Sequence, residues 1–434
     1  MMAHKKETFA QTLYRWLYSL FLIACLPLLL LLFKKKLRMD PNYSGQPRKF
    51  NERFGCVPTK LSGGGILVHC VSMGELNASV QLVNRLQENF PELPITVTTT
   101  STTGAMHAYT LYKDSVQHLF LPIDIPFFMH SFFNKLKPKL VLVTEVEIWP
   151  NMIHQCVKRD IPLCLINARL SDESLPMYQK LSFLLRPALR QFDVICAQSQ
   201  SSYDNFTKMG VYKPQLKLTL NMKFDIEPSQ DDEVKATLLK DKYGFGDGPI
   251  WLAASTHEPE EKFVLNVFAK LLTNFPTLRL ILVPRHPHRF DDVYLIAKAT
   301  GLTVTRLSDD DRAQAQVTVV DQMGWLKACY CICSQAFIGG SIAQKGGHNA
   351  LECAMYAKPM VMGTSIFNNP GIVEMLKAQG SLDLIESEEQ CFERLKDLLL
   401  DANINEAKGQ AGLAVLLNNR GAVEMTYQQV TDLL

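Results

Sequence analysis

The 434-residue chain lacks several patterns that would assign it to a familiar class of protein. Its eleven cysteines follow no regular spacing, which argues against a disulfide framework and indicates a reducing compartment. Its net charge is only +2, so we expect no nucleic-acid partner. The turn after the first predicted strand has Gly74 alone, where a dinucleotide fingerprint needs three glycines, and an NAD site is therefore disfavoured. No Asp-x-Asp signature follows a predicted strand, and we expect no metal and no cofactor.

Two patterns nevertheless suggest a metal site. Cys329, Cys331 and Cys333 alternate, which on a strand would place all three thiols on one face. Zinc sites favour longer gaps, so packed core thiols are expected instead. The sequence His286-Pro287-His288 has a ligand-like spacing, but its two flanking arginines fit a phosphate or a carboxylate better than a metal.

Long hydrophobic runs are confined to the N-terminus. Residues 17–33 carry no charge, and this length is at the lower limit of roughly 17–25 residues for a spanning helix. No small-residue cleavage pattern follows, so a removed signal peptide is not expected. The basic residues that follow the run are Lys34, Lys35, Lys36, Arg38, Arg48, Lys49 and Arg53. By the positive-inside rule, they predict that the main body lies in the cytoplasm. Lys5, Lys6 and Arg15 precede the run, so the anchor is expected to be either single-pass or monotopic.

From Gly63 onward the chain alternates apolar runs with helical patterns. Strands are expected at residues 66–71, 95–98, 118–121, 140–143, 163–166 and 194–197, and again at 250–254, 278–283, 317–320, 336–338 and 359–362. This alternation predicts an α/β fold with doubly wound parallel sheets, and the length predicts two domains. We expect a membrane anchor (1–38), two Rossmann-like domains (39–226 and 227–420) and a last helix (421–434) that can cross back to the first domain. By analogy of fold alone, this is the architecture of GT-B glycosyltransferases.

The stretch 337–352 contains two Gly-Gly pairs between a predicted strand and a predicted helix. Unpaired N–H groups and the helix dipole make such a turn a good place for a phosphate, and Glu352 could accept hydrogen bonds from a ribose. The alternative is a tight turn with a capping-box glutamate, but two Gly-Gly pairs favour the nucleotide interpretation. The segment 339–343 also nearly forms the nucleophile elbow of an α/β-hydrolase around Ser341, although it ends in alanine.

Charged residues follow several predicted strands. Glu75, after the first strand, is equally consistent with a first-turn residue that complements the helix dipole and with a general base. Glu145 and Glu147 follow the fourth strand, beside Trp149. Lys223 lies near the join between the domains, either as a surface lysine or as a contact to a phosphate or an acid.

In this order, the motifs resemble those of the bacterial Kdo (3-deoxy-D-manno-octulosonic acid) transferases of lipid A assembly. The resembling blocks are residues 71–75, 98–104, 145–151, 167–171, 221–225, 255–261, 283–289, 321–324 and 339–352. They cover nearly the whole chain, and the set is specific although no single block is.

The resemblance implies an inverting glycosyltransferase that moves Kdo from CMP-Kdo to a lipid A precursor (lipid IVA) at the inner membrane. It implies that Glu75 accepts a proton and that Glu145 and Lys223 help to stabilise the transition state. The residues that it implies in CMP binding are Pro284, Arg285, Met323, Gly324, Trp325, Asn349, Ala350, Leu351 and Glu352. The chain departs from the family at Trp325, where an acid is usual, and at Ala350, where proline is common. Alternative functions are a UDP-sugar-dependent GT-B glycosyltransferase of the cell envelope and a membrane-tethered nucleotide-binding protein without turnover.

Overall fold

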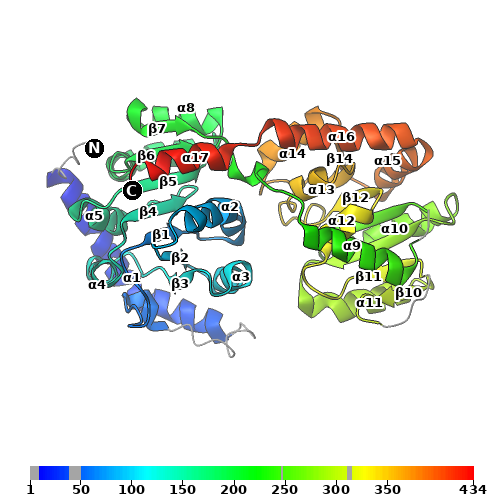
Figure 1. Cartoon of the computed structure of the whole chain (residues 1–434), viewed down its shortest axis with the longest axis horizontal. Coiled ribbons are helices and arrows are strands. Elements are labelled where there is room, and N and C mark those ends of the chain that lie inside the picture. Colours follow the sequence, from blue (N-terminus) through cyan, green and yellow to red (C-terminus); the bar gives the residue numbers. More distant parts are fainter. Residues whose placement is uncertain (1–8, 39–49, 246–247, 310–314) are drawn as a thin grey trace. The chain divides into compact units, whose positions relative to one another are not determined.

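The computed structural model of the chain describes residues 9–38, 50–245, 248–309 and 315–434. The chain divides into two compact units (Figure 1). Unit 1 comprises Met1–Asp225 and Arg420–Leu434, and unit 2 comprises Ile226–Asn419. Lys5, Lys6, Arg48 and Lys49, which contributed to the expected membrane orientation, lie outside the described residues, as do the side chains of residues 32–38.

Unit 1 is built on a parallel sheet of seven strands in the order β3-β2-β1-β4-β5-β6-β7. Its strands are β1 (Ile66–His69), β2 (Ile95–Thr99), β3 (Gln117–Phe120), β4 (Leu140–Thr144), β5 (Leu163–Ala168), β6 (Val194–Ala197) and β7 (Leu216–Leu218). Leu67 and Val141 are buried on one face of the sheet, and Val68 and Leu142 on the other. Burial of both faces explains why these strands are continuous apolar runs rather than alternating patterns.

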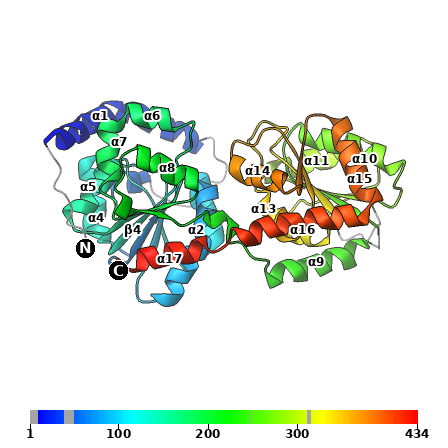
Figure 2. The ribbon, with the colours of Figure 1, turned by 90° about the horizontal axis from the view of Figure 1, so that it is seen from above.

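Helices cover both faces of the unit 1 sheet. One face is covered by α4 (Pro126–Leu136), α5 (Pro150–Lys158), α7 (Ser182–Leu189) and α8 (Gln200–Lys208), and the other by α2 (Met73–Asn89), α3 (Thr102–Tyr112) and α17 (Ala422–Thr431). Figure 2 shows α1 (Phe9–Arg38) and α6 (Leu175–Lys180) on the first side and α2 and α17 on the second. The last helix is joined to unit 1 through Asp225, whose carboxylate accepts hydrogen bonds from the N–H groups of Gly421 (2.6 Å) and Val423.

Unit 2 repeats the design with the strand order β10-β11-β9-β8-β12-β13-β14, again all parallel. Its strands are β8 (Ile250–Thr256), β9 (Arg279–Pro284), β10 (Val304–Arg306), β11 (Val317–Val319), β12 (Gln335–Ile338), β13 (Met360–Gly363) and β14 (Leu382–Ile385). Its helices are α9 (Gln230–Tyr243), α10 (Glu260–Leu272), α11 (Phe290–Lys298), α12 (Leu326–Ile332), α13 (Leu351–Met355), α14 (Pro370–Ala378), α15 (Glu388–Leu400) and α16 (Ala402–Asn418). Side chains of α10, α11 and α15 form the core on one face of this sheet.

The predicted fold class of two doubly wound parallel sheets is confirmed, and every strand expected from the sequence is present. The sequence missed β7, β10 and β14, which are short and lie at or near the sheet edges, where partial exposure removes the apolar run. Cys329 and Cys331 lie on α12 and Cys333 follows it, so the three thiols do not share the face of a strand. Within the described residues, no group of three or more His, Cys, Asp or Glu side chains is arranged to hold a metal ion.

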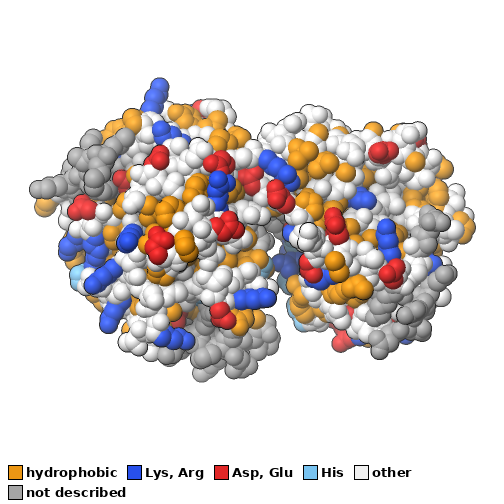
Figure 3. Space-filling model, viewed as in Figure 1, with side chains coloured by type: hydrophobic (Ala, Val, Ile, Leu, Met, Phe, Trp, Pro, Cys, Tyr) orange, Lys and Arg blue, Asp and Glu red, His pale blue; other side chains and the backbone are white. Residues whose placement is uncertain are grey.

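The surface is mixed in charge. On the faces visible in Figure 3, basic and acidic side chains are interspersed over each unit, as the net charge of +2 would suggest. The larger apolar side chains that remain exposed in unit 1 are concentrated on α1, where Leu20 and Phe21 are 59% and 66% exposed.

Candidate active site

The connections of the unit 1 sheet change direction at β1. Its neighbours are β2 on one side and β4 on the other, so the gap between β1 and β4 is the topological switch point. Ligands of doubly wound sheets bind beyond the carboxyl ends of the strands at such a point. Glu75 follows β1 and Glu145 follows β4, so both acids lie at this edge of the sheet.

Glu75 is buried in the first turn of α2, with only 6% of the residue exposed. It forms a capping box with Ser72: Ser72 Oγ accepts from the Glu75 N–H (3.2 Å) and Glu75 Oε1 accepts from the Ser72 N–H (3.1 Å). Glu75 Oε2 accepts from the Val71 N–H (2.9 Å) and from Thr144 Oγ1 (2.5 Å). Burial raises the pKa of Glu75, and the negative charge of Glu145 adds to the rise. The residue therefore stabilises its helix and is also a carboxylate with an enhanced affinity for a proton.

Glu145 and Lys223 form an ion pair at the same edge. Glu145 adopts a left-handed backbone conformation (φ 54°) directly after β4, and its Oε1 lies 3.5 Å from Lys223 Nζ. Lys223 lies on a 3₁₀ turn, η4 (Met222–Phe224), whose N–H groups donate to Asn221 Oδ1 (3.0 Å) and to Asn167 Oδ1 (3.0 Å). Two asparagines thus fix the turn that carries the lysine. The structure brings together the three residues that the resemblance assigned to catalysis.

Glu147 is a further member of this acidic edge, and it was not among the predicted catalytic residues. Burial, followed by the charges of Glu75 and Glu145, raises its pKa to about 7. The sequence did contain the signal, because two acids separated by one residue follow a strand that ends at the switch point. The spacing alone did not show which side chains each acid contacts, since those contacts come from residues that follow neighbouring strands.

We expect Glu147→Gln to remove part of the pH dependence of stability. A carboxyl whose folded pKa of about 7 lies above its ordinary value of 4.5 favours the folded state when protonated. Its contribution is present below the ordinary value and is lost as the pH rises through about 7. As the pH rises from about 5 to about 8, the free energy of unfolding of the variant should therefore increase by about 1–3 kcal/mol relative to that of the parent protein. Urea unfolding of both proteins at the two pH values measures this gain. If the variant and the parent differ in unfolding free energy by the same amount at both pH values, the prediction is wrong.

The corresponding switch point of unit 2 lies between β8 and β12, because β9 flanks β8 on the other side. The glycine-rich loop begins here, and a Cβ atom on Gly339 would lie 2.4 Å from Ser255 O. Gly340 follows with φ 72°, a conformation that favours glycine. The first Gly-Gly pair is therefore required by the close approach of the loop to β8.

The N–H groups of residues 340–343 and 346–348 are already bound within the protein, whereas the phosphate contact predicted for the turn that follows them stays a prediction. The Glu260 carboxylate accepts hydrogen bonds from the N–H groups of Gly340 (2.8 Å), Ser341 (2.9 Å), Ile342 (2.9 Å), Ala343 (3.2 Å) and His257 (2.9 Å). The N–H groups of the second Gly-Gly pair and of His348 donate to Ser365 Oγ, Gly340 O and Gly339 O. A buried carboxylate thus occupies the anion-binding position at the start of the loop.

The predicted CMP-binding residues of unit 2 lie on three segments at the carboxyl edge of its sheet. Arg285 follows β9 and acts electrostatically on Glu352 of α13; burial raises the pKa of Glu352 and the nearby cations Lys327 and Arg285 oppose the rise. Ala350 and Leu351 are buried, with 1% and 0% of each residue exposed.

The third segment follows β11 and is the most exposed. Met323 is 60% exposed, Gly324 has φ 85°, and Trp325 begins α12. Lys235 Nζ lies 5.7 Å from the centre of the Trp325 ring and donates to Gly324 O (3.3 Å). A cation of α9 therefore occupies one face of the residue that departs from the family pattern. Arg289, by contrast, pairs with Glu258 (3.0 Å) and Glu261 (3.2 Å), so its oxyanion partners are carboxylates of the protein itself.

Comparison with known proteins identifies the family. A family model described as 3-deoxy-D-manno-octulosonic-acid transferase (kdotransferase) matches residues 48–226. The 3-deoxy-D-manno-octulosonic acid transferase of Haemophilus influenzae is 37% identical over 432 residues, 97% of this chain and 98% of that protein. The chain belongs to the Kdo transferase family. The Kdo transferase of Rickettsia bellii is 29% identical over 83% of this chain and 86% of that protein.

Solved structures assign this Kdo transferase to the GT-B fold. The UDP-GlcNAc 2-epimerase of Neisseria meningitidis, solved with UDP-GlcNAc, superposes with a TM-score of 0.57 at 13% identity and covers 85% of this chain and all of that one. At this identity the likeness concerns the fold alone. The GT-B prediction is confirmed.

Membership of the Kdo transferases makes the chain a glycosyltransferase that acts in lipopolysaccharide biosynthesis. The alternatives of a UDP-sugar-dependent enzyme and of a binding protein without turnover are therefore rejected. The α/β-hydrolase interpretation is also wrong, because Ser341 is fully buried and its Oγ donates to Ile338 O (2.6 Å) and accepts from the Gly363 N–H (2.8 Å). This hydroxyl connects two strands of the sheet and is closed to substrate.

Proposed function

We propose that this Kdo transferase moves Kdo from CMP-Kdo to a lipid A precursor such as lipid IVA, with inversion at the anomeric carbon. Glu75 takes the proton from a sugar hydroxyl of the acceptor. That oxygen attacks the anomeric carbon of Kdo, and CMP leaves with the bonding electrons. The observation that carries the proposal is the buried Glu75 carboxylate, whose pKa is raised, at the switch point of unit 1 and close to Glu145.

The charges around the reaction have the signs that it needs. The transition state has oxocarbenium character, so positive charge grows on the sugar while negative charge grows on the departing phosphate. Glu145 and Lys223, held 3.5 Å apart, supply fixed charges of both signs. Charges that are already in place stabilise the transition state without the cost of reorganisation.

Unit 2 is proposed to hold the nucleotide. Pro284 and Arg285 follow from β9, Met323, Gly324 and Trp325 from the loop after β11, and Asn349, Ala350, Leu351 and Glu352 from the glycine-rich loop and α13. Ala350 and Leu351 are buried, so their role is proposed to be the positioning of Asn349 and Glu352. Trp325 is proposed to contact CMP through its main chain, since Lys235 lies over its ring. The substitution of the usual family acid therefore leaves the contact intact.

The test of this function is the mass of the product. Purified protein is incubated in detergent with CMP-Kdo and lipid IVA, and the lipid is examined by mass spectrometry. We expect the lipid to gain Kdo and CMP to be released in equal amount. A lipid that gains no Kdo from CMP-Kdo, or that gains a sugar from UDP-sugars instead, would overturn the proposal.

The membrane attachment is proposed to be monotopic, because the first half of α1 is bound to unit 1. Ser19 and Arg15 are buried, and the Asn151 side chain hydrogen-bonds both: Asn151 Nδ2 donates to Ser19 Oγ (3.0 Å) and Arg15 Nη1 donates to Asn151 Oδ1 (3.4 Å). Asn151 Nδ2 also donates to Asp124 O (2.6 Å), and the Tyr18 side chain hydrogen-bonds the Asp124 carboxylate. These buried polar contacts tie one face of α1 to the start of α5.

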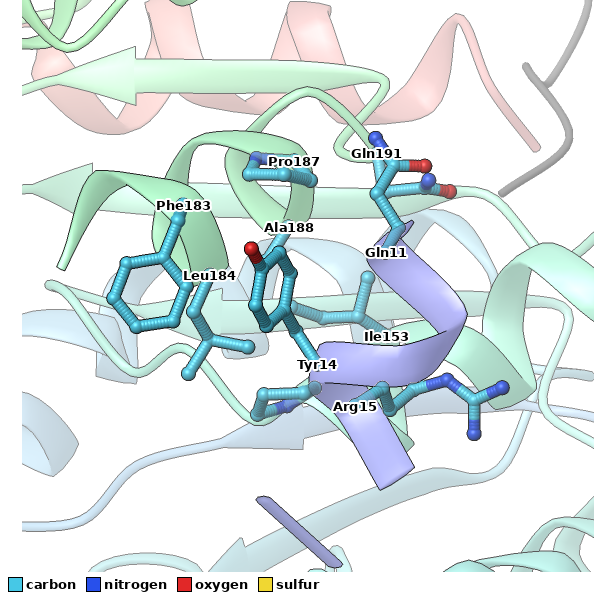
Figure 4. Close-up of a pocket in the computed structure, with 10 residues that line it drawn as sticks. Gln11, Tyr14, Arg15, Ile153, Phe183, Leu184, Pro187, Ala188 and Gln191 are labelled. Atoms are coloured by element: carbon cyan, nitrogen blue, oxygen red, sulfur yellow. The ribbon is translucent and has the colours of Figure 1, made fainter. Parts of the chain in front are cut away.

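Aromatic and apolar contacts extend this attachment toward α7. The rings of Tyr14 and Phe183 lie with their centres 4.9 Å apart, and Leu184 and Ala188 lie beside them (Figure 4). A hollow of ≈ 360 Å³, open to solvent, remains between α1 and helices α5 and α7. The docked face therefore covers roughly the first three turns of the helix.

The length that remains is too short to cross a bilayer. The apolar segment suitable for spanning is Gln11–Leu31, and its residues up to Ser19 are engaged by unit 1. The fourteen uncharged residues from 20 to 33 extend about 21 Å as a helix, whereas a hydrocarbon core is about 30 Å thick. Leu20, Phe21, Leu28 and Leu31 are all more than half exposed and would enter the interface.

We expect the double variant Leu20→Ser, Phe21→Ser to lose at least about tenfold in its partition into lipid vesicles, because each side chain contributes apolar area to the membrane. Sedimentation with vesicles of bacterial phospholipid measures the partition. The matched control is Leu295→Ser, Leu400→Ser, which removes two leucines of unit 2 that are 62% and 66% exposed. If the control and the α1 variant partition alike, α1 is not the membrane-binding element.

A further inference from the structure

The carboxyl edge of the unit 2 sheet carries a row of histidines that the proposed reaction does not use. His257 follows β8, His286 and His288 follow β9, and His348 lies in the loop after β12. Because β9, β8 and β12 are neighbours in the sheet, these four residues of distant sequence positions meet at the switch point.

The rings are in direct contact. The Nε2 atoms of His257 and His348 are 2.9 Å apart, and the two rings stack with their centres 5.1 Å apart. The His286 ring meets the His257 ring edge-on at 5.1 Å, and His288 stacks on His286 at 5.4 Å. A bond between two imidazole nitrogens needs one N–H and one lone pair, so at least one ring of the His257–His348 pair is neutral.

The surroundings of His257, His286 and His348 favour their neutral forms while supplying positive charge. Burial and Arg285 lower the pKa of His257, and lower that of His348 to about 3. Burial, His257 and Arg285 lower the pKa of His286 to about 4. Near neutral pH, His257, His286 and His348 therefore offer uncharged N–H donors beside the Arg285 guanidinium.

The acids near the row are already engaged. Glu258 and Glu261 both pair with Arg289, and Glu260 is held by main-chain N–H groups. Among the residues that the structure describes, no acidic side chain lies within salt-bridge distance of Arg285. Arg285 thus has Glu352 as an electrostatic neighbour but no salt-bridge partner among the described residues, and its guanidinium fork remains open to an oxyanion.

We propose that His257, His286 and His348, together with Arg285, bind the carboxylate of the donor sugar. This inference rests on the proposed function, because it takes CMP-Kdo as the donor. An octulosonic acid carries a carboxylate as well as the phosphate of its nucleotide, so the donor presents two oxyanions. Neutral imidazole N–H groups and a planar guanidinium fork match a carboxylate. A donor sugar without that carboxylate would leave the imidazole N–H groups and the guanidinium unpaired. The site would therefore select acidic sugars over neutral ones.

The experiment uses His286→Ala in the full-length protein, because His286 is exposed and its loss should not disturb the fold. Calorimetric titration without acceptor gives the dissociation constants of CMP and of CMP-Kdo, and a separate assay gives turnover. We expect the constant for CMP-Kdo to rise at least about tenfold and that for CMP to change less than about twofold. His288→Ala, one ring further along the row, is the matched control and should leave both constants unchanged.

Three results would overturn the inference. If His286→Ala weakens CMP and CMP-Kdo equally, the row binds the phosphate that both share. If neither constant changes, His286 does not contact the sugar. If His288→Ala has the same effect as His286→Ala, the loss comes from disturbed packing of the stacked rings rather than from a lost contact with the carboxylate. A parent protein that binds CMP-Kdo but shows no transfer to the lipid would contradict the proposed function alone.

Discussion

Replacement of Glu75 by glutamine is expected to lower the rate of Kdo transfer by about 10²–10⁴-fold, the usual contribution of a general base. Glutamine has nearly the same shape as glutamate and can also close a capping box, so α2 should remain intact. The amide cannot accept the proton of the acceptor hydroxyl. Initial rates with CMP-Kdo and lipid IVA measure the loss, and titration with CMP should show unchanged affinity because the nucleotide is proposed to bind in unit 2.

The matched control for this variant is Ser72→Ala. It removes the hydroxyl that accepts the Glu75 N–H at 3.2 Å but leaves the carboxylate in place. We expect it to cost about 0.5–2 kcal/mol of stability, the usual value of an N-cap, with little change in turnover. If Glu75→Gln retains most of its activity, or if Ser72→Ala loses as much, Glu75 acts through the helix rather than as a base.

The second large effect is expected for Glu260→Ala. This carboxylate accepts five main-chain hydrogen bonds, four of them from consecutive residues of the glycine-rich loop. Its removal leaves buried N–H groups without an acceptor, and the combined loss should be about 3–5 kcal/mol. Calorimetric unfolding should show unit 2 melting at lower temperature, and CMP affinity should fall because Asn349–Glu352 continue from the same loop.

Hydrogen exchange localises this effect. In the Glu260→Ala variant, the amides of residues 340–343 should exchange much faster than in the parent protein, because each has lost its acceptor. The control is Glu258→Gln, two residues away, whose exposed carboxylate meets only Arg289 and should contribute less than about 0.5 kcal/mol. Unchanged protection of residues 340–343 in Glu260→Ala would mean that the loop is held by its other hydrogen bonds.

Much of the fold could be predicted from the sequence because both sheets are buried on two faces. Leu67 and Val68 of β1 enter different cores, so the whole strand must be apolar and is visible as a run. Glu75 and Glu145 could be placed at one edge for the same reason, since residues that follow parallel strands lie at the same end of the sheet. The edge strand β14 was missed because Asp383 and Leu384 are only partly buried and the pattern weakens.

Other features could not be predicted, because they depend on which strands are neighbours. The glycine-rich loop has the composition of a phosphate site, yet its N–H groups are bound by Glu260, about 80 residues earlier, since β8 lies beside β12. The same adjacency brings His257 and His348 into contact, and it was not readable from either motif. Likewise, the contacts of Arg15 and Ser19 with Asn151 are made across more than 130 positions of sequence, so the apolar length of α1 could not show them.

By itself, the sequence therefore determined the class of fold, the family resemblance and the chemical type of the groups at the strand ends. Local composition and periodicity carry that information because each strand and each motif is continuous in the chain. Only the tertiary structure decided which of those groups are partnered, since their pKa values and hydrogen bonds are set by atoms from distant segments that meet when the sheet assembles.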